Sequence, residues 1–356
     1  MEGDHIKINH WLIPLSGIYG LVVGIRNILF DCGLLHSKSF DVPVIDVGNI
    51  SAGGTGKTPH TEYLIRLLSK KHQVAVLSRG YKRKSSGYLL ATKDTPMQLI
   101  GDEPFQMKKK FPHIHMAVDS NRRRGISKLC QTDVTPKTDV IVMDDAYQHR
   151  YITPSINILL MDYHRLVYFD KLLPAGRLRE PRSSSQRADI VIVTKCPDYI
   201  TPMEQHGIAR SLQMQPWQKL FFTRFNYQNL VHITSGRQMP LDSLKEKDCN
   251  ILLLTAIASP QQMEYDLKKY CQFTSLHFAD HHNFSKKDLA NIQHAFDTLC
   301  ANQKETIIIT TEKDAARLQA CAQEMPFYPY IYILPVEVHF LDDGQIEFNQ
   351  TILKRV

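Results

Sequence analysis

A glycine-rich loop between a predicted strand and a predicted helix constrains the fold of this chain more than any other feature. The loop begins at Gly48 and ends in the triplet Gly56-Lys57-Thr58. Before it lies an apolar β-type run, residues 44–47, and after it a helical pattern, residues 57–69. Glycines let backbone N–H groups turn inward around phosphates, and the helix N-terminus adds a positive dipole. The sequence therefore predicts a phosphate-binding loop.

The loop follows the pattern GxxxxGK[ST] with one departure, since Ser51 stands where the first glycine is usual. Lys57 is expected to reach the β- and γ-phosphates, and the Thr58 hydroxyl is expected to ligate Mg²⁺. We therefore expect ATP and Mg²⁺ as cofactors. The residues expected to bind the nucleotide are Ser51, Ala52, Gly53, Gly54, Thr55, Gly56, Lys57 and Thr58.

Alternating strand and helix patterns predict the fold class, α/β with mainly parallel sheets. Strands are expected at residues 44–47, 74–77, 114–118, 140–143, 156–161 and 190–193, with helices at 57–69 and 102–110. A second alternation starts at residue 251 and includes a helix at 285–299. These patterns predict a P-loop NTPase-like α/β/α sandwich and a second, smaller α/β/α domain joined by a two-stranded β connector. The runs 220–227 and 330–340 are expected to pair as that connector.

A chain of 356 residues exceeds the size at which single cores stop growing, which favours two domains. We expect an N-terminal helical segment at 1–40, a P-loop domain at 41–218, the connector at 219–228 and 330–350, and the smaller domain at 229–329. Seven scattered cysteines without a CxxC pair fit reduced cytosolic thiols and give no grounds for zinc.

The formal charge of +7 is modest, but basic residues cluster at 82–84, 108–110 and 122–124. Such clusters suit phosphorylated ligands or anionic lipid headgroups, or they are solvated surface. They lack the interleaved aromatics of a stacking platform, so we expect no nucleic-acid partner.

The apolar stretch 11–30 is interrupted by Pro14, three glycines and Arg26, which makes it a poor spanning helix and an unlikely signal peptide. On helical spacing its apolar side chains share one broad face, while Ser16 and Asn27 fall largely away from it. One hypothesis is a helix lying in a membrane interface. The alternative is a helix packed on the protein's own core.

Carboxylates that follow predicted strands are candidates for metal binding and proton transfer. Asp144 and Asp145 end the apolar strand 140–143, where an aspartate can bind the metal of a phosphoryl-transfer site. Asp102 and Glu103 open a predicted helix, as a base and a metal ligand or simply as helix N-terminal residues. His281 lies beside Asp280, and either His281 or the adjacent histidine could face such a carboxylate.

Nearly the whole chain resembles the tetraacyldisaccharide 4′-kinase family, the lipid A kinases of bacteria with an outer membrane. The matching stretches are residues 14–20, 47–59, 78–81, 101–104, 144–150, 173–181, 256–260, 278–282 and 311–315. The resemblance implies transfer of the ATP γ-phosphate to the 4′-hydroxyl of a tetraacyl glucosamine disaccharide 1-phosphate. It also implies peripheral or monotopic attachment to the anionic cytoplasmic face of the bacterial inner membrane. We expect no obligate protein partner.

By the same resemblance, Asp102 would be the base with His281 as its partner, and Glu103, Thr58 and Asp144 would serve Mg²⁺. The residues implied to line the reacting centre are Asp144, Asp145, His149 and Glu180. The chain departs from the family pattern at Ala146-Tyr147, usually Gly-Phe, and at Ala256, usually glycine. A rival reading is a membrane-recruited P-loop ATPase switch, which would not need the acidic segment 101–104.

Overall fold

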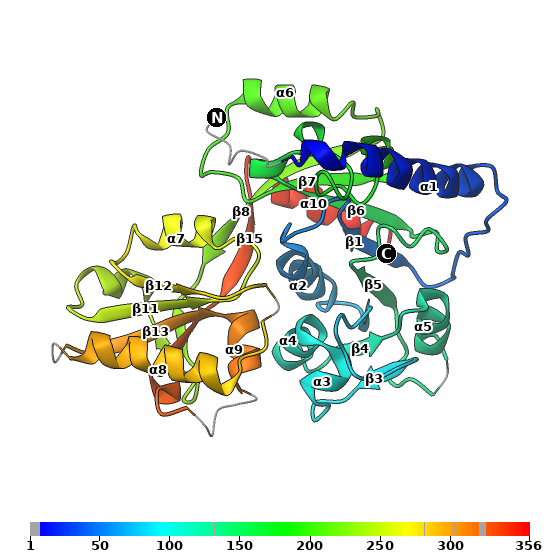
Figure 1. Cartoon of the computed structure of the whole chain (residues 1–356). Helices are drawn as coiled ribbons and strands as arrows, with labels where there is room; N and C mark the ends of the chain where they lie inside the picture. Colours follow the sequence, from blue (N-terminus) through cyan, green and yellow to red (C-terminus); the bar gives the residue numbers. More distant parts are fainter. Residues whose placement is uncertain (1–7, 132, 281, 302–303, 320–324) are drawn as a thin grey trace. The chain divides into compact units, whose positions relative to one another are not determined.

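The computed structural model describes residues 8–131, 133–280, 282–301, 304–319 and 325–356. Within them the chain forms two compact units, one of residues 1–225 and 338–356 and the other of residues 226–337 (Figure 1). Each unit is an α/β structure built on one mainly parallel sheet. The predicted fold class is thus confirmed.

The sheet of the first unit has the strand order β15-β8-β7-β6-β1-β5-β2-β4-β3. Its strands are β1 Val44–Gly48, β2 Val74–Ser78, β3 Leu89–Ala91, β4 His115–Val118, β5 Val140–Asp144, β6 Ile156–Asp162, β7 Ile190–Thr194, β8 Lys219–Tyr227 and β15 Val336–Phe340. Strand β1 pairs in parallel with β5 and β6, whereas β3 pairs antiparallel with β4. Because β1 is central and ends at Gly48, the glycine-rich loop emerges at the middle of the carboxyl edge of the sheet.

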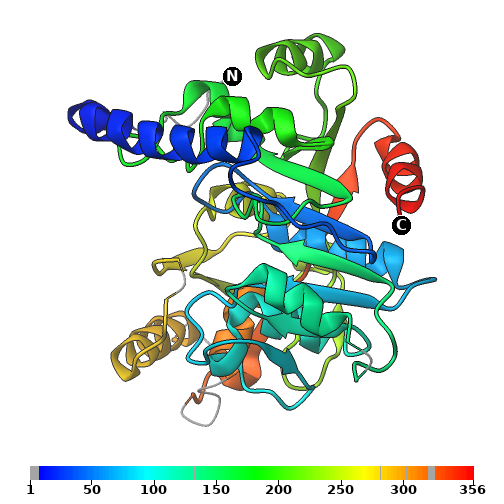
Figure 2. The same ribbon diagram turned by 90° about the vertical axis from the view of Figure 1, so that its right-hand side faces the viewer.

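Helices cover both faces of this sheet (Figure 2). On one face Ile45 and Val47 pack with Leu64 and Leu68 of α2 and Met107 of α4. Ile126 of α5 and Ile208 of α6 belong to the clusters on the opposite face. The helices of this unit are α1 Ile13–Asp31, α2 Lys57–Leu68, α3 Met97–Ile100, α4 Asp102–Lys110, α5 Arg122–Leu129, α6 Pro202–Ser211 and α10 Gly344–Leu353.

The second unit has the strand order β10-β9-β14-β13-β11-β12. Its strands are β9 Leu230–His232, β10 Gln238–Met239, β11 Asn250–Thr255, β12 Thr274–His277, β13 Thr306–Thr311 and β14 Ile331–Leu334, and its helices are α7 Gln261–Leu267, α8 Lys286–Cys300 and α9 Glu312–Gln319. Leu253 packs with Met263 of α7 on one face, and Leu254 packs with Ile292 of α8 on the other.

The segment expected at 330–340 as one strand is divided between the two sheets. Residues 331–334 form β14 in the second sheet, and β15 begins at Val336 in the first, because Pro335 between them has no N–H to continue a ladder. Strands β8 and β15 are neighbours at one end of the larger sheet. Residues 344–350, expected in the connector, are helical instead. Phe348 and Ile352, four residues apart on α10, pack into the core beside Phe340.

Helix α1 turns its apolar face outward. Ile18, Leu21 and Val22 are each more than 60% exposed, whereas Ser16 and Asn27 are buried. The Ser16 hydroxyl donates to the carbonyl of Leu172 at 2.9 Å, and the Asn27 amide donates to the Ser184 hydroxyl at 3.4 Å. Residues 10–31 are long and apolar enough to cross a membrane by length and composition, although we had expected a poor spanning helix. This exposed apolar face favours the hypothesis of a helix lying in a membrane interface, while Val23 and Phe30 on the other side of α1 are buried against the protein.

The three arginines at 122–124 serve the protein's own structure. Arg122 is buried and donates to the backbone carbonyls of Asp119 and Asp144, at 2.5 and 3.2 Å. Arg124 forms two hydrogen bonds of 2.8 Å with the carboxylate of Asp119, and Arg123 lies over the Tyr151 ring. Arg122 is therefore not part of a solvated basic patch, whereas Arg124 is exposed with its charge paired to Asp119.

Candidate functional site

The glycine-rich loop has the backbone conformation that its sequence requires. Gly56 precedes α2 with φ = +83°, and Gly53 has φ = +124°, both in the region that favours glycine. The amide of Asn49 donates to the Thr55 hydroxyl at 2.9 Å, which braces the loop across its base. The N-terminus of α2, with Lys57 and Thr58 in its first turn, points its free N–H groups into this loop.

Ser51 replaces the usual first glycine because this part of the loop is extended. Ser51 forms an antiparallel bridge with Leu178, and the N–H of Ala52 donates to the carbonyl of Arg177 at 2.7 Å. Neither Ser51 nor Ala52 has a positive φ. The first half of the loop is thus one strand of a short ladder, where a side chain is tolerated.

The strand β5 brings Asp144 and Asp145 to the loop. Asp145 has a left-handed backbone, φ = +50°, and lies 3.5 Å from Nζ of Lys57 and 3.5 Å from Nη1 of Arg179. Burial alone would raise the pKa of Asp145, but the cations Lys57 and Arg179 outweigh it and lower the pKa. Asp145 is therefore ionised. It pairs with Lys57, the lysine that is expected to bind the phosphates of a nucleotide.

Asp144 is buried, and its environment suits a metal ligand. Its Oδ2 accepts from the Ser78 hydroxyl at 3.2 Å, while its Oδ1 is buried without a hydrogen bond from the described residues. Burial raises the pKa of Asp144 to about 6, and the nearby carboxylates Asp145 and Glu103 add to this effect. A buried oxygen without a donor fits a hard cation such as Mg²⁺.

Asp102 and Glu103 begin α4 at the same edge of the sheet. A methyl group at Gly101 (φ = +92°) would lie 2.9 Å from the carbonyl oxygen of Tyr81, so the turn before α4 packs closely on the segment that follows β2. The negative charge of Glu103 contributes to the raised pKa of Asp144. The alternative that both acids are helix N-terminal residues also fits, since both lie in the first turn of α4.

His149 and Glu180 each present a buried polar atom without a partner in the described part of the chain. These atoms are Nε2 of His149 and Oε1 of Glu180. Burial, followed by the charge of Arg122 and other arginines, lowers the pKa of His149 to about 4, so the ring is neutral at pH 7. The other carboxylate oxygen of Glu180 accepts from Arg187 at 2.8 Å. The departure at Tyr147 is accommodated, because its buried hydroxyl donates to the Ser184 carbonyl.

The histidine pair of the second unit is described only in part, because His281 lies outside the described residues. His282 stacks on Phe278 with ring centroids 5.1 Å apart. Its Nε2 lies 2.9 Å from Oδ2 of Asp288, which also belongs to the capping box of α8. Nearby, the N–H of Ala256 donates to buried Asp314, and Ala256 needs no positive φ.

The segment 170–180, from which only Glu180 was predicted as a site residue, is ordered beside the loop by hydrogen bonds to a buried carboxylate. Buried Asp170 accepts from the N–H groups of Lys171 and Arg177, at 2.8 and 3.1 Å, and from Nε of Arg165 at 2.7 Å. The alternation Arg177-Leu178-Arg179 was a signal that could have predicted an extended segment here.

Gly176 in this segment has no room for a side chain. A methyl group there would lie 2.2 Å from the Lys171 carbonyl oxygen and 2.3 Å from Oδ1 of Asp170. We expect Gly176→Ala to lower the free energy of unfolding by about 1–3 kcal/mol, the usual cost of overpacking. The control is Gly24→Ala in α1, where the methyl meets nothing within 4 Å and alanine should stabilise by up to about 1 kcal/mol. Urea unfolding followed by circular dichroism checks both, and equal midpoints would contradict the packing argument.

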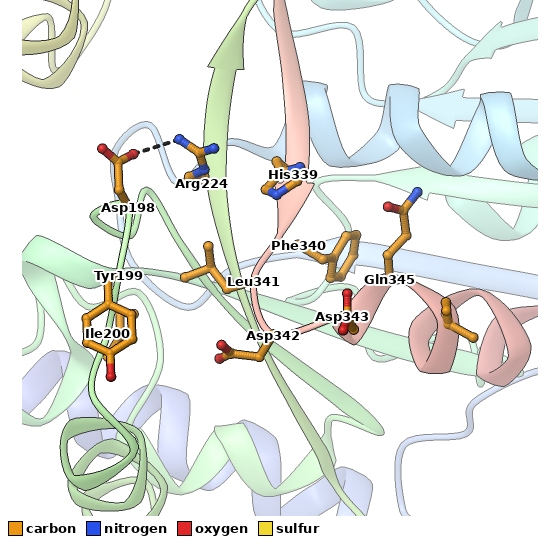
Figure 3. A pocket seen from close by; sticks show the side chains of 11 residues that line it. Asp198, Tyr199, Ile200, Arg224, His339, Phe340, Leu341, Asp342, Asp343 and Gln345 are labelled. Carbon is orange, nitrogen blue, oxygen red and sulfur yellow. Dashed lines mark hydrogen bonds and ion pairs between the residues drawn. The ribbon is translucent and has the colours of Figure 1, made fainter.

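A separate cavity of about 460 Å³ lies among β8, β15 and the start of α10 (Figure 3). Asp198 and Arg224 form an ion pair of 2.6 Å across part of it. Its lining residues include neither the glycine-rich loop nor any predicted site residue. We therefore place the candidate site at the loop, where glycine geometry, the helix N-terminus and unpaired buried atoms converge.

The fold and the loop together define a P-loop nucleotide-binding protein of the α/β class. Residues 8–356 match the family model described as tetraacyldisaccharide-1-P 4′-kinase, and the chain belongs to that family. A tetraacyldisaccharide 4′-kinase of Phocaeicola vulgatus is 55% identical over 99% of this chain and 96% of its own length. The enzyme of the same name from Flavobacterium johnsoniae is 44% identical over 97% of this chain and 96% of its own.

Among solved structures, the chain is similar to LpxK from Aquifex aeolicus in complex with ATP. The two sequences are 29% identical, and the TM-score is 0.73 over 98% of this chain and 99% of the other.

Proposed function

We propose that this protein is a kinase that transfers the γ-phosphate of ATP to the 4′-hydroxyl of a tetraacyl glucosamine disaccharide 1-phosphate. Membership of the family and the names of relatives 42–55% identical support this activity. The observation that carries the proposal is a set of buried polar atoms beside the loop that have no hydrogen-bond partner among the described residues: Asp144 Oδ1, His149 Nε2 and Glu180 Oε1. Such atoms are costly unless a ligand satisfies them.

Three residues would hold Mg²⁺, namely Thr58, Glu103 and Asp144. Bound there, the ion would neutralise charge on the β- and γ-phosphates. Lys57 would exchange Asp145 for the phosphates, because its present contact with Asp145 is 3.5 Å long and easily replaced. His149, neutral at pH 7, and Glu180 would line the acceptor's side of the reacting phosphate. The backbone amides of residues 53–58 would bind the phosphate oxygens.

Asp102 would accept the proton of the acceptor hydroxyl, oriented by His281. His282 is the weaker candidate for that role, because Asp288 already engages its ring nitrogen. We also propose a membrane-associating helical segment at 1–40, a kinase domain at 41–218 and a smaller domain at 229–329. The proposed connector consists of 219–228 and 336–340, because α10 replaces its expected continuation to residue 350.

The direct test is incubation of the purified protein with γ-labelled ATP, Mg²⁺ and detergent-dispersed acceptors. The panel contains the tetraacyl disaccharide 1-phosphate, the same lipid lacking its 4′-hydroxyl, and soluble sugars. We expect label in the first lipid alone. Label released only as inorganic phosphate would contradict the proposed transfer and favour the ATPase switch.

The outward apolar face of α1 supports attachment to a membrane surface, and membership of the family supports the cytoplasmic face of the bacterial inner membrane as that surface. Replacing Ile18, Leu21 and Ile25 with glutamate should reduce flotation with anionic vesicles by about tenfold or more, since charge opposes insertion. Folding should be retained, because all three side chains are exposed. The matched control is Met203→Glu on α6, which is 85% exposed and should float like the parent. Unchanged flotation of the triple variant would refute attachment through α1.

A further inference from the structure

An extended segment runs alongside the first half of the phosphate-binding loop. The carbonyl of Arg177 accepts from the N–H of Ala52, and the N–H of Arg179 donates to the carbonyl of Ile50, each at 2.7 Å. Leu178 lies opposite Ser51 as an antiparallel bridge. The position of this segment is therefore tied to the loop by backbone hydrogen bonds.

Side-chain alternation in this segment directs the two arginines away from the core. Leu178 is buried in the cluster of Ile50 and Leu159. Neighbours of a buried residue in an extended strand point to the opposite face, so Arg177 and Arg179 share the face that Leu178 leaves. Nη1 of Arg179 lies 3.5 Å from Asp145, and Nη1 of Arg177 lies 3.8 Å from the position a methyl group would take on Gly53.

The backbone of Arg177 is fixed on both sides, because its N–H donates to buried Asp170 while its carbonyl accepts from Ala52. Gly176 permits the close approach to Asp170, because a methyl group there would lie 2.3 Å from Oδ1 of Asp170. The side chain alone keeps its freedom. These two hydrogen bonds hold the backbone of Arg177 in place beside the loop, unlike that of an arginine on a mobile surface loop.

The guanidinium of Arg177 is exposed and makes no hydrogen bond or ion pair with any side chain that the structure describes. The other two cations at the loop, Lys57 and Arg179, share Asp145. A planar guanidinium with five donors binds phosphate oxygens in pairs, and its charge is not lost at any physiological pH. Its position over Gly53 therefore suits an anion cradled by the loop.

We infer that Arg177 is a further phosphate-binding residue, which contacts the terminal phosphates of the nucleotide held by residues 51–58. This inference rests on the proposed nucleotide site. During phosphoryl transfer negative charge is redistributed over the terminal phosphates. An arginine of the same chain that contacts these phosphates stabilises that charge in the transition state. The lipid acceptor also carries a phosphate, so the test must separate the two sources of this chemistry.

Calorimetric titration with ATP, ADP and AMP, without any lipid, makes that separation. We expect Arg177→Ala to weaken ATP binding on the order of tenfold, ADP binding less and AMP binding not at all, because the lost charge faces the terminal phosphates. Arg177→Lys should recover most of the ATP affinity, since it keeps the charge. Arg210→Ala, an exposed arginine of α6, is the control and should bind like the parent.

Unchanged ATP affinity in Arg177→Ala would overturn the inference, and so would an equal loss for all three nucleotides. A raised KM for the lipid with unaltered ATP binding would assign Arg177 to the acceptor's phosphate and overturn it as well. Failure of the parent protein to bind ATP would instead refute the proposed nucleotide site, which distinguishes the two results. Because Arg177 is exposed, both variants should show the parent's thermal midpoint.

Discussion

Asp102→Asn should reduce transfer to the lipid acceptor by a factor on the order of a hundred or more while ATP still binds. Asparagine keeps the size and helix-start position of Asp102 in α4 but cannot accept a proton, and general-base catalysis contributes about 10²–10⁴-fold. A hundredfold loss corresponds to about 2.7 kcal/mol of transition-state stabilisation. Initial rates at saturating ATP measure the loss of transfer, and calorimetric titration with ATP measures whether the nucleotide still binds.

The matched control for that variant is Asp94→Asn, an exposed aspartate a few residues upstream of α3. It should turn over at the parent's rate. Full activity in Asp102→Asn would remove Asp102 as the base and restore its alternative reading as a helix N-terminal residue. A rate that recovers at high pH in Asp102→Asn would point to a different base with a higher pKa.

Asp144→Asn should lose at least about a hundredfold in turnover and should need more Mg²⁺ for what remains, because a neutral amide is a poor ligand for a hard cation. The same substitution should raise the thermal midpoint of metal-free protein at pH 8. Burial raises the pKa of Asp144 to about 6, so the folded protein binds the proton more tightly than the unfolded chain. Ionised Asp144 therefore costs stability above pH 6.

The stability difference between Asp144→Asn and the parent should shrink as the pH falls from about 6 toward 4, where the parent's carboxyl becomes protonated. Mg²⁺ with ATP should stabilise the parent more than the variant, which reverses the order. Thermal scans in a chelator and in Mg-ATP check both orders. A variant that is less stable than the parent in chelator at pH 8 would contradict the burial argument.

The elements around the loop could be predicted because they obey local rules. Helix α4 was predicted at its observed bounds, since acids open it and lysines close it. Strand β5 ends at Asp144, one residue beyond its predicted end. The prediction is close because the change from an apolar run to a carboxylate marks the end of a buried strand. These are short-range patterns, and they also gave the loop and its place between β1 and α2.

The remaining features depend on contacts distant in sequence. Nothing local shows that Ser51 pairs with Leu178, so the departure from the glycine pattern had no explanation before the bridge was seen. The sequence places Arg122 in a basic cluster, but its side chain is buried and donates to the Asp144 carbonyl at the end of β5. Pro335 marks the break between β14 and β15, but the alternating pattern of 330–340 runs through this position and predicts a single strand.

The inner face of α1 contacts the segment beside the phosphate-binding loop, which gives the helix a structural role besides the proposed membrane anchoring. The Tyr19 hydroxyl donates to the Arg179 carbonyl at 2.8 Å, and the Ser16 hydroxyl accepts from the N–H of Ala175. Deleting α1 would thus remove the proposed membrane anchor and also the hydrogen bonds that hold residues 175–179, the segment of the proposed phosphate-binding Arg177. Slow turnover of a truncated protein could therefore come from lost membrane attachment or from displacement of residues 175–179. Substitutions confined to the outer face of α1 test membrane attachment alone.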